Sequence, residues 1–341
     1  MNITDPCTVA TQSREIRRNV IKHLTASGCE PELADWMVHD FGYRGSTSEE
    51  SAALGGAAHL LSFFGSDTIA GDILLRNYYE GDLDVLVSGS IPASEHSTVT
   101  TWGEEHESNF IENALKTYPT GPLANVTDSY DSERFVTVHA AEHKSLILNR
   151  EGKYIFRPDS GNPQEMSLKH LEWIGNRLLG GEGFGWTRNT KDFKVLNPKV
   201  GMIYGDGMDY ESIDRYYENL VHNGWAASNS AVGSGGGLLQ KLDRDTQRFA
   251  FKACWCQVNG EDRDVFKKPS SDLSKSSKRG RLVVLPYSLS PDIPMVTYSE
   301  EEAKKQGLDT SRDLLLTVFE DGKLLKEYAL SDIRSLVKSY G

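Results

Sequence analysis

"KVGMIYGDGMDYESIDRYYENLVHNGWAASNSAVGSGGG", residues 199–237, contains the pattern on which the fold prediction rests. An apolar run ends in the polar turn Gly-Asp-Gly, and in the stretch that follows apolar residues recur at intervals of three and four. A second strand-like run then ends in three glycines. This order predicts a strand, an amphipathic helix that covers it, and a second strand, which is the repeating unit of a parallel α/β fold.

Similar strand-like runs recur along the chain. They span residues 7–15, 36–45, 57–68, 85–97, 122–132, 153–163 and 249–260. Units repeated roughly every thirty residues favour a closed (β/α) barrel, with an open sheet as the alternative that periodicity alone leaves open. Polar residues lie at or just after the ends of these runs: Asp40, Asp67, His96, Asp128, Asp159, Asp206 and Ser234. Because barrel enzymes build their sites at the carboxyl ends of the strands, we expect the active site there.

The rhythm stops after about residue 260. A basic, serine-rich stretch is followed by a strand-like run at 281–288 and by a predicted hairpin at 313–330 with Asp-Gly at its turn. A helix with Ser331 as its N-cap closes the chain. We therefore predict a barrel at 1–260 and a partial, mainly β domain at 261–341, since two or three strands and a helix bury little core alone.

Composition excludes several classes of protein. The chain has 341 residues, of which 38% are hydrophobic and 25% charged, as expected of a globular protein with a sizeable core. Its net charge of −12 argues against a nucleic-acid partner. No apolar run is long enough to span a membrane, and the N-terminus has no apolar leader, so we expect a cytoplasmic protein. The four cysteines suit a reducing compartment and lack the spacing of a zinc site.

The three glycines at 235–237 are the sharpest indication of an anion site. Between a strand and a helix, they allow backbone N–H groups to approach a ligand, and Arg244 lies two helical turns further on. The run is neither a Walker A loop nor a GxGxxG dinucleotide motif. The alternative is an ordinary flexible turn.

Other residues could hold a sugar, a ring or a cation. Arg157 can hold a phosphate or stack on a ring, while Asp159 can accept from sugar hydroxyls or bind Mg²⁺ through water; a surface ion pair is the alternative. Asp206 lies between two glycines, which suits a ribose diol but is also a common turn.

Two further positions indicate a flat amide ligand. Phe41, beside Arg44, suits an electron-poor ring at the barrel mouth, and an ordinary core position is the alternative. A carboxylate at Asp67 could accept from an amide NH₂ group and would repel a ligand carboxylate. Glu95 and His96 stand at a strand-to-helix turn, where they form either a structural pair or part of the site.

These motifs occur in an order that resembles one enzyme family. They are "HDFGYRG", "GSDT", "IPASEHST", "DSYD", "RPDSGNP", "GDG", "GSGGGLLQKLDRD" and "SKRGR". From about residue 7 to its C-terminus, the chain resembles the nicotinamide phosphoribosyltransferases. The resemblance implies an irregular (β/α) barrel of the type II phosphoribosyltransferase kind with a partial, mainly β second domain. It also implies a transferase of NAD biosynthesis that joins nicotinamide to phosphoribosyl pyrophosphate.

The resemblance assigns roles to the candidate residues. For nicotinamide it implies Phe41, Asp67, Ser90 and Arg157. For the phosphoribosyl group and its phosphates it implies Arg44, Asp128, Asp159, Gly205, Asp206, Gly235, Gly236, Arg244, Lys252, Lys267 and Lys275. For water-mediated Mg²⁺ it implies Asp128 and Asp159.

The family also uses ATP as a co-substrate. The resemblance implies that ATP phosphorylates His96 and that Glu95 hydrogen-bonds the imidazole or its neighbours. His96, Glu95, Asp159 and Arg157 are therefore the expected catalytic residues.

Members of this family extend further at the N-terminus, so the resemblance implies a shortened chain. In the family the preceding region supplies much of the β domain and an aromatic residue for the partner subunit's nicotinamide pocket. We expect a homodimer or a complex with a separate N-terminal polypeptide. The alternatives are a catalytically incomplete nucleotide-binding subunit and a transferase acting on nicotinate or another pyridine.

Overall fold

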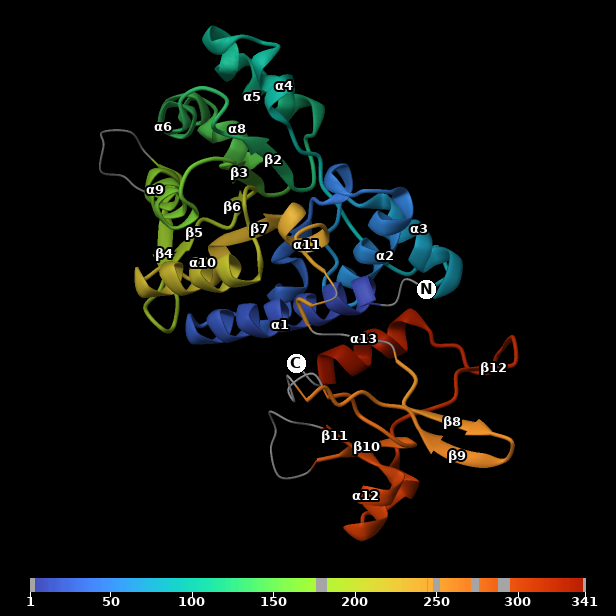
Figure 1. Ribbon diagram of the computed structural model, residues 1–341. Coiled ribbons are helices and arrows are strands. Elements are labelled where there is room, and N and C mark those ends of the chain that lie inside the picture. Colours follow the sequence, from blue (N-terminus) through green and yellow to red (C-terminus); the bar gives the residue numbers. More distant parts are fainter. Residues whose placement is uncertain are drawn as a thin grey trace. The chain divides into compact units, whose positions relative to one another are not determined.

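The protein folds as two units (Figure 1). The computed structural model describes residues 4–175, 183–243, 245–247, 252–270, 276–287 and 295–339. Unit 1 comprises Met1–Phe249 and Ala329–Gly341, and unit 2 comprises Ala250–Tyr328.

A parallel sheet forms the centre of unit 1. Its strands are β1 (Val38–Asp40), β2 (Leu123–Val126), β3 (Tyr154–Arg157), β6 (Val200–Tyr204) and β7 (Ser230–Ser234), in the order β1-β7-β6-β3-β2. Single parallel bridges continue this order at Asp40–Ser66, Gly65–Gly89 and Ala93–Ala124. The segments around residues 65–66 and 89–93 therefore connect the two edge strands and close the ring. The predicted irregular α/β barrel is confirmed.

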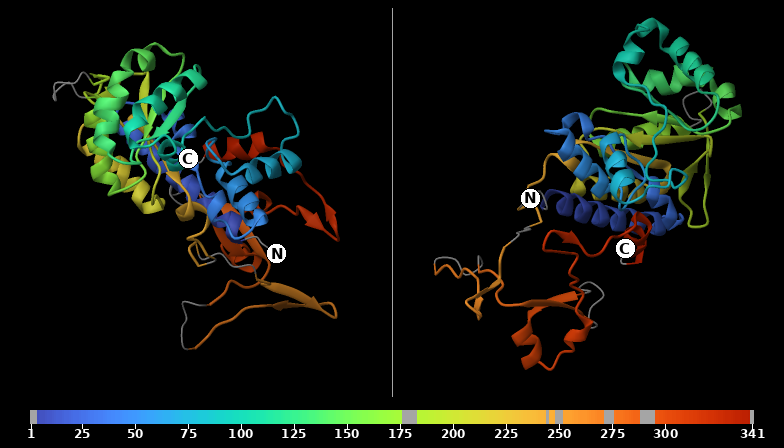
Figure 2. Two further views of the ribbon diagram at one scale, coloured as in Figure 1. Left: turned by 90° about the horizontal axis from the view of Figure 1, so that it is seen from above. Right: turned by 90° about the vertical axis from the view of Figure 1, so that its right-hand side faces the viewer.

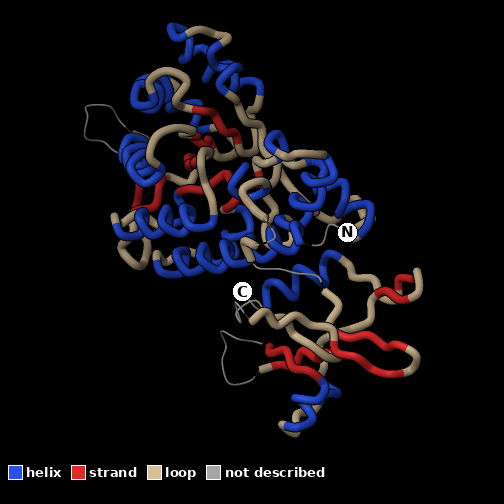
Figure 3. The backbone as a smooth tube through the Cα atoms, in the orientation of Figure 1, coloured by secondary structure: helices blue, strands red, loops and turns tan. Residues whose placement is uncertain are grey.

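Helices surround this ring (Figure 3). The longer ones are α1 (Thr4–Ala26), α2 (Glu49–His59), α3 (Ile69–Tyr78), α5 (Glu107–Thr117), α9 (Pro163–Gly175) and α10 (Tyr210–His222). The short ones are α4 (His96–Thr100), α6 (Ser132–Arg134), α7 (Ala140–Glu142), α8 (Lys144–Asn149) and α11 (Gly236–Leu239). Short 3₁₀ helices are η1 (Pro31–Trp36), η2 (Tyr43–Gly45), η3 (Glu104–His106) and η5 (Ala227–Asn229), and η4 (Phe135–His139) is a π-helix.

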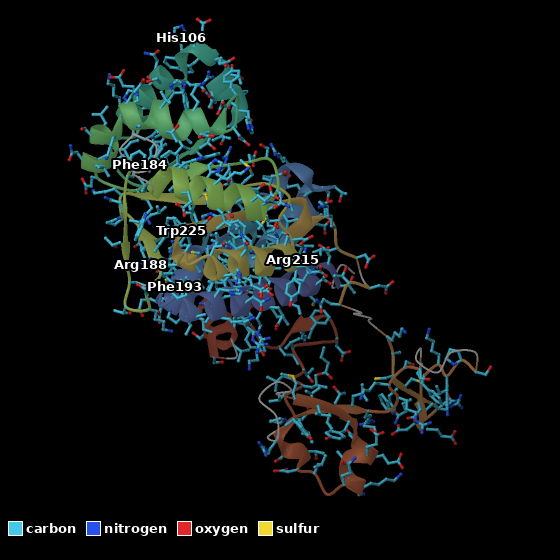
Figure 4. All side chains as sticks on the ribbon, turned by 90° about the vertical axis from the view of Figure 1, so that its left-hand side faces the viewer. His106, Phe184, Arg188, Phe193, Arg215 and Trp225 are labelled. Carbon is cyan, nitrogen blue, oxygen red and sulfur yellow. The ribbon has the colours of Figure 1, made fainter. Side chains whose placement is uncertain are left out.

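Helix α10 buries the apolar residues whose spacing in the sequence predicts it. Asp209 caps it by accepting a hydrogen bond from the Ser212 N–H at 2.9 Å. Its apolar face, which includes Ile213 and Leu220, is fully buried, as the three-and-four spacing predicts. Trp225 follows the helix and is also buried (Figure 4). The amphipathic helix predicted after residue 209 is confirmed.

Two of the expected barrel strands are absent. Residues 7–15 belong to α1, because Val9, Ile16, Val20 and Leu24 are buried at intervals of seven and four, which is a helical face. The run at 249–260 contributes β8 (Trp255–Val258), which pairs antiparallel with β9 (Glu261–Asp264) in unit 2. Both predictions were wrong because alternation over a few residues does not distinguish a helix or a hairpin from a barrel strand.

Unit 2 consists of small antiparallel sheets. Besides β8-β9 it contains β10 (Leu282–Pro286) paired with β11 (Met295–Ser299), and β12 (Phe319–Glu320) paired with β13 (Lys323–Leu324). It also holds α12 (Glu300–Lys305) and the turn η7 (Thr310–Arg312). Asp321 and Gly322 have φ angles of 49° and 79°, so the predicted Asp-Gly hairpin is confirmed. A further hairpin, β4 (Trp186–Arg188) with β5 (Lys194–Leu196), belongs to unit 1.

The C-terminal helix α13 (Leu330–Ser339) belongs to unit 1. The predicted division at 260 placed it in the second domain, whereas unit 2 begins at Ala250 and ends at Tyr328. Leu330 explains the difference, since it is buried in a cluster with Leu60, Leu75 and Val87 of unit 1. The helix begins at Leu330, so Ser331 is its second residue and not its N-cap.

Glu107 of α5 is a buried carboxyl group away from the strand ends. It has no exposed surface, neither oxygen accepts a hydrogen bond from the described residues, and Oε2 lies 3.7 Å from His139 Nε2. Burial raises the pKa of Glu107 to about 7, and Arg134 opposes this rise only in part. Between pH 5 and 7, the Glu107 carboxyl group is therefore protonated in the folded state but ionised in the unfolded chain.

We expect Glu107→Gln to remove this pH-dependent cost. Because the folded-state pKa is raised, the wild type should lose stability as the pH rises from 5 to 8, by on the order of 1–3 kcal/mol relative to the variant. Urea unfolding of both proteins at pH 5 and pH 8 measures the difference. An equal difference in unfolding free energy between wild type and variant at the two pH values would contradict the raised pKa of Glu107.

Candidate active site

The polar residues predicted at strand ends lie at one end of the barrel. Asp40 and Ser234 end β1 and β7, and Asp128, Asp159 and Asp206 come two residues after β2, β3 and β6. Asp67 and His96 follow the bridged segments at 65–66 and 89–93. Since all these segments run parallel, the carboxyl ends meet on the same face, as predicted.

A cavity of about 710 Å³ opens at this end. Its volume falls in the range of small-molecule sites. It is lined by eleven of the predicted residues: Phe41, Arg44, Asp67, Glu95, His96, Arg157, Asp159, Gly205, Asp206, Gly235 and Gly236. It is also lined by four that the sequence analysis missed: Gly42, Tyr43, Gly45 and Gly207. All four are direct neighbours of predicted residues in "HDFGYRG" and "GDG", and that adjacency was the available indication.

The position of Phe41 depends on a missing side chain in β7. A Cβ atom at Gly233 would lie 2.0 Å from Phe41 Cε2, so the ring occupies the space that any other residue would fill. The Phe41 N–H donates to the Ser234 carbonyl at 2.9 Å, which fixes the backbone. Because Phe41 is only half-buried and lines the cavity, its role is not that of an ordinary core residue.

Asp67 and Ser90 come from the two bridged segments. The Ser90 hydroxyl donates a hydrogen bond to the Asp67 carboxylate. The Ser66 N–H donates to the Gly89 carbonyl at 3.1 Å, which holds the segments side by side. Asp67 therefore faces the cavity with its orientation set by Ser90.

His96 begins α4 and contacts two aspartates. Its Nε2 atom lies 3.1 Å from Asp128 Oδ1, and its Nδ1 atom lies 3.9 Å from Asp159 Oδ2. The His96 side chain is 44% exposed whereas that of Asp128 is 7% exposed, so the imidazole reaches the cavity from a buried support.

Asp128 holds this arrangement together. Its Oδ2 atom accepts from the Asp159 N–H at 3.0 Å and from the Ser160 hydroxyl. Glu95, expected to hydrogen-bond the imidazole or its neighbours, accepts through its carboxylate from the hydroxyl of Ser97, the residue that follows His96. Asp128, expected at the phosphates or metal, is thus the residue that orients His96.

The glycine loop leads from β7 into a very short helix. Helix α11 has four residues, so its dipole adds less than expected, and the N–H groups of Leu238 and Leu239 already donate to the Gly235 carbonyl. A Cβ atom at Gly236 would meet nothing within 4 Å, whereas one at Gly237 would lie 2.3 Å from the Met208 carbonyl. Gly236 therefore borders open space, and Gly237 packs against the turn after β6.

Four predicted cations are not placed at the cavity. Arg244 and Lys275 lie outside the described residues. Lys252 and Lys267 are exposed residues of unit 2, whereas the residues that line the cavity belong to unit 1. Their phosphate-binding roles stay predictions.

Comparison with known proteins identifies a family for the chain that carries these cavity residues. The model of the nicotinate phosphoribosyltransferase (NAPRTase) family matches residues 36–323. The chain belongs to this family. It is 40% identical, over 97% of its length and 69% of the relative's, to a nicotinamide phosphoribosyltransferase of Xanthomonas campestris pv. campestris. It is 33% identical, over 96% of its length and 66% of the relative's, to a protein of the same name from Acinetobacter baylyi.

Other relatives are matched over less of their length. A nicotinamide phosphoribosyltransferase of Mycoplasma genitalium is 35% identical over 80% of this chain and 59% of its own. The chain thus spans between about three fifths and about two thirds of these curated relatives. A crystal structure of nicotinate phosphoribosyltransferase from Porphyromonas gingivalis is similar with a TM-score of 0.43 and 16% identity, covering 70% of this chain and 51% of that one.

Negative charge concentrates at one side of the cavity of this NAPRTase-family chain. Burial raises the pKa of Asp159, and Asp128 and Asp206 raise it further against the opposing effect of Arg157 and His96. A Cβ atom at Gly205 would lie 2.4 Å from Asp159 Oδ1, so the carboxylate packs directly on the backbone after β6. A cation or a developing positive charge would relieve this repulsion.

The described residues fit a hydrated cation better than a protein-ligated one. Among them, no group of three or more His, Cys, Asp and Glu side chains is arranged to hold a metal. Both oxygens of Asp128 already contact protein groups, which leaves Asp159 and Asp206 to face water. Mg²⁺ commonly keeps its waters and is shared with substrate phosphates, a mode these carboxylates can serve.

Within the described residues, no helix combines the length and apolar character needed to cross a bilayer.

Proposed function

We propose that this protein is a nicotinamide phosphoribosyltransferase, which joins nicotinamide and phosphoribosyl pyrophosphate to give nicotinamide mononucleotide and pyrophosphate in NAD biosynthesis. The names of its relatives support the reaction. The observation that carries the choice of substrate is Asp67, because this carboxylate lines the same cavity as Phe41 and would accept from a carboxamide but repel a carboxylate.

The cavity offers a group for each part of the reaction. Phe41 and Arg157 would flank the pyridine ring, and Asp67, held by Ser90, would bind its amide N–H. The ring nitrogen then forms a bond to the ribose C1 while the bond from C1 to the pyrophosphate oxygen breaks. Because the ring nitrogen is already nucleophilic, positioning carries much of the rate.

Positive charge develops at the ribose C1 in the transition state, and nearby carboxylates can stabilise it. The oxocarbenium character of the transition state would be stabilised by Asp159 and Asp206, whose mutual repulsion it relieves. Arg44 and the N–H groups of the glycine loop would hold the phosphates. Mg²⁺, when bound with the substrate phosphates, supplies charge neutralisation of the leaving pyrophosphate.

Coupling to ATP is the part of the proposal that rests on His96. With Asp128 accepting the Nε2 proton, the imidazole lone pair lies on Nδ1. Nδ1 then forms a bond to the γ-phosphorus of ATP, ADP leaves, and water later releases phosphate to restore the histidine. The 44% exposure of the His96 side chain supports access for a nucleotide.

Assembly and location complete the proposal. Unit 2 exposes large apolar residues such as Leu316, Phe319 and Leu324 while burying few, which supports a homodimer or a complex with a separate polypeptide. All four cysteines are free, which supports a cytoplasmic location.

Exchanging Asp67→Ser tests the choice of nicotinamide. Removing the acceptor should lower the ratio of kcat/KM for nicotinamide to kcat/KM for nicotinate by at least about tenfold, the effect of losing one charged hydrogen bond and one repulsion. Mononucleotide formation from each pyridine, with phosphoribosyl pyrophosphate and Mg²⁺, measures the ratio.

The wild type provides the reference for this test. It should form nicotinamide mononucleotide far faster than the nicotinate product. A wild type that prefers nicotinate, or a variant with an unchanged ratio, would show that Asp67 does not select the amide. A wild type that binds phosphoribosyl pyrophosphate but forms no product would favour the incomplete subunit.

A further inference from the structure

The C-terminal helix α13 packs against unit 1, where its first residue joins a cluster with residues of α2 and α3 (Figure 2). Its first residue, Leu330, is buried with Leu60 and Val87, and its N–H donates to the Tyr79 carbonyl at 3.2 Å. The chain thus leaves unit 1 after Phe249 and returns to it for its last residues. Such a return needs a reason in packing or in function.

Arg334 joins two segments of the barrel through their backbones. Its Nε and Nη2 atoms donate to the Leu60 carbonyl at 3.0 and 2.8 Å. Its Nη1 donates to the Leu86 carbonyl at 3.1 Å, and Nη2 also donates to the Val87 carbonyl at 2.6 Å. The planar guanidinium is suited to such a fork of acceptors, and the ammonium of lysine is not.

The two segments are the ones that build the amide end of the cavity. Leu60 lies in the segment that continues to Asp67, and Val87 lies three residues before Ser90. The segments pair through the bridge between Gly65 and Gly89. A guanidinium that fixes the start of both segments therefore fixes how the Asp67 and Ser90 side chains meet.

A stack of rings strengthens this connection. Arg334 Cζ lies 4.3 Å from the centroid of the Phe64 ring, and Phe64 stacks on Trp36 with centroids 5.5 Å apart. A Cβ atom at Gly89 would lie 2.8 Å from the Trp36 ring, so this indole packs directly on the segment that carries Ser90. Burial lowers the pKa of Arg334 to about 10, which indicates that its charge is largely removed from water.

We propose that Arg334 is a positioning residue for amide recognition, which acts by holding the segments of Asp67 and Ser90 in register. This role rests on the proposed function, since it concerns the same cavity. Arg334 touches no residue that lines the cavity in the hydrogen bonds described, so it acts through the backbone and not on the substrate.

Kinetics of Arg334→Ala test the proposal, with Leu336→Ala as the matched control because Leu336 lies on the same helix and is exposed. We expect Arg334→Ala to raise the KM for nicotinamide about tenfold and to lower the amide-to-acid ratio, as loss of alignment does, while the KM for phosphoribosyl pyrophosphate stays within about twofold. Arg334→Lys should recover little, and Leu336→Ala should match the wild type. Equal changes in both KM values, or full activity of Arg334→Lys, would overturn the proposal.

Hydrogen exchange separates this inference from the reaction itself. The amides of Ser66 and Gly89, which bond across the two segments, should exchange at least about tenfold faster in Arg334→Ala and Arg334→Lys than in Leu336→Ala. This readout holds whichever pyridine the wild type uses and even if it forms no product. Unchanged exchange at both amides would overturn the positioning role, and an Arg334→Ala chain that fails to fold leaves Arg334→Lys to decide.

Discussion

Gly233→Ala should raise the KM for nicotinamide by about 100-fold, the effect expected when a binding group moves by about 1 Å. The new Cβ atom would lie 2.0 Å from Phe41 Cε2 and 2.2 Å from Phe41 Cδ2, and no real contact is that short. The β7 backbone cannot retreat, since it is paired with β1 on one side and β6 on the other. The Phe41 ring must therefore leave its place in the cavity. Steady-state kinetics with varied nicotinamide measure the loss.

Gly201→Ala is the matched control for this change. Gly201 also lies in a barrel strand, but its Cβ atom would meet the flexible end of Lys153 at 3.1 Å, which can move at little cost, and the Asn229 carbonyl oxygen at an ordinary contact distance of 3.9 Å. The KM of the Gly201→Ala variant for nicotinamide should stay close to that of the wild type. Thermal unfolding of both variants should show a cost of about 1–3 kcal/mol for Gly233→Ala, typical of overpacking.

A double-mutant cycle shows whether the ring is the cause. In a Phe41→Ala background, adding Gly233→Ala should change the KM for nicotinamide very little, because the group it displaces is already gone. Two effects that simply add would show that Gly233 acts through something other than Phe41.

The residues of the cavity were predictable from sequence because each lies close along the chain to the end of a strand. Asp128, Asp159 and Asp206 each follow an apolar run by two residues, and parallel strands bring such positions together whatever the details of packing. The glycine loop and Phe41 could be placed at the same end for the same reason.

Contacts between distant segments could not be predicted in this way. The space for Phe41 comes from Gly233, and the partner of His96 is Asp128 and not its neighbour Glu95. Both pairings depend on which strands become neighbours, and periodicity along the chain does not contain that information. The return of α13 to unit 1 is another example, because it rests on Leu330 filling a cluster built from α2, α3 and Val87.

His96→Ala should abolish the stimulation of mononucleotide formation by ATP and leave the ATP-independent rate measurable. In the proposed mechanism the imidazole is the nucleophile; it is exposed beside Asp128, and no other group in the described cavity lining combines a ring nitrogen with such support. Asp128→Asn should lower the stimulation at least about tenfold. The Asp159 N–H and the Ser160 hydroxyl would retain the amide oxygen, so the amide NH₂ would face Nε2, donate to it and favour the other tautomer.

His106→Ala is the control, since His106 is an exposed histidine of η3 that lies outside the cavity lining (Figure 4). Its ratio of rates with and without ATP should equal that of the wild type, and labelled γ-phosphate should enter the wild type and His106→Ala but not His96→Ala. Stimulation that survives in His96→Ala would mean that ATP acts elsewhere on the protein. Stimulation that survives in Asp128→Asn alone would leave His96 as the nucleophile but remove Asp128 as the residue that orients it.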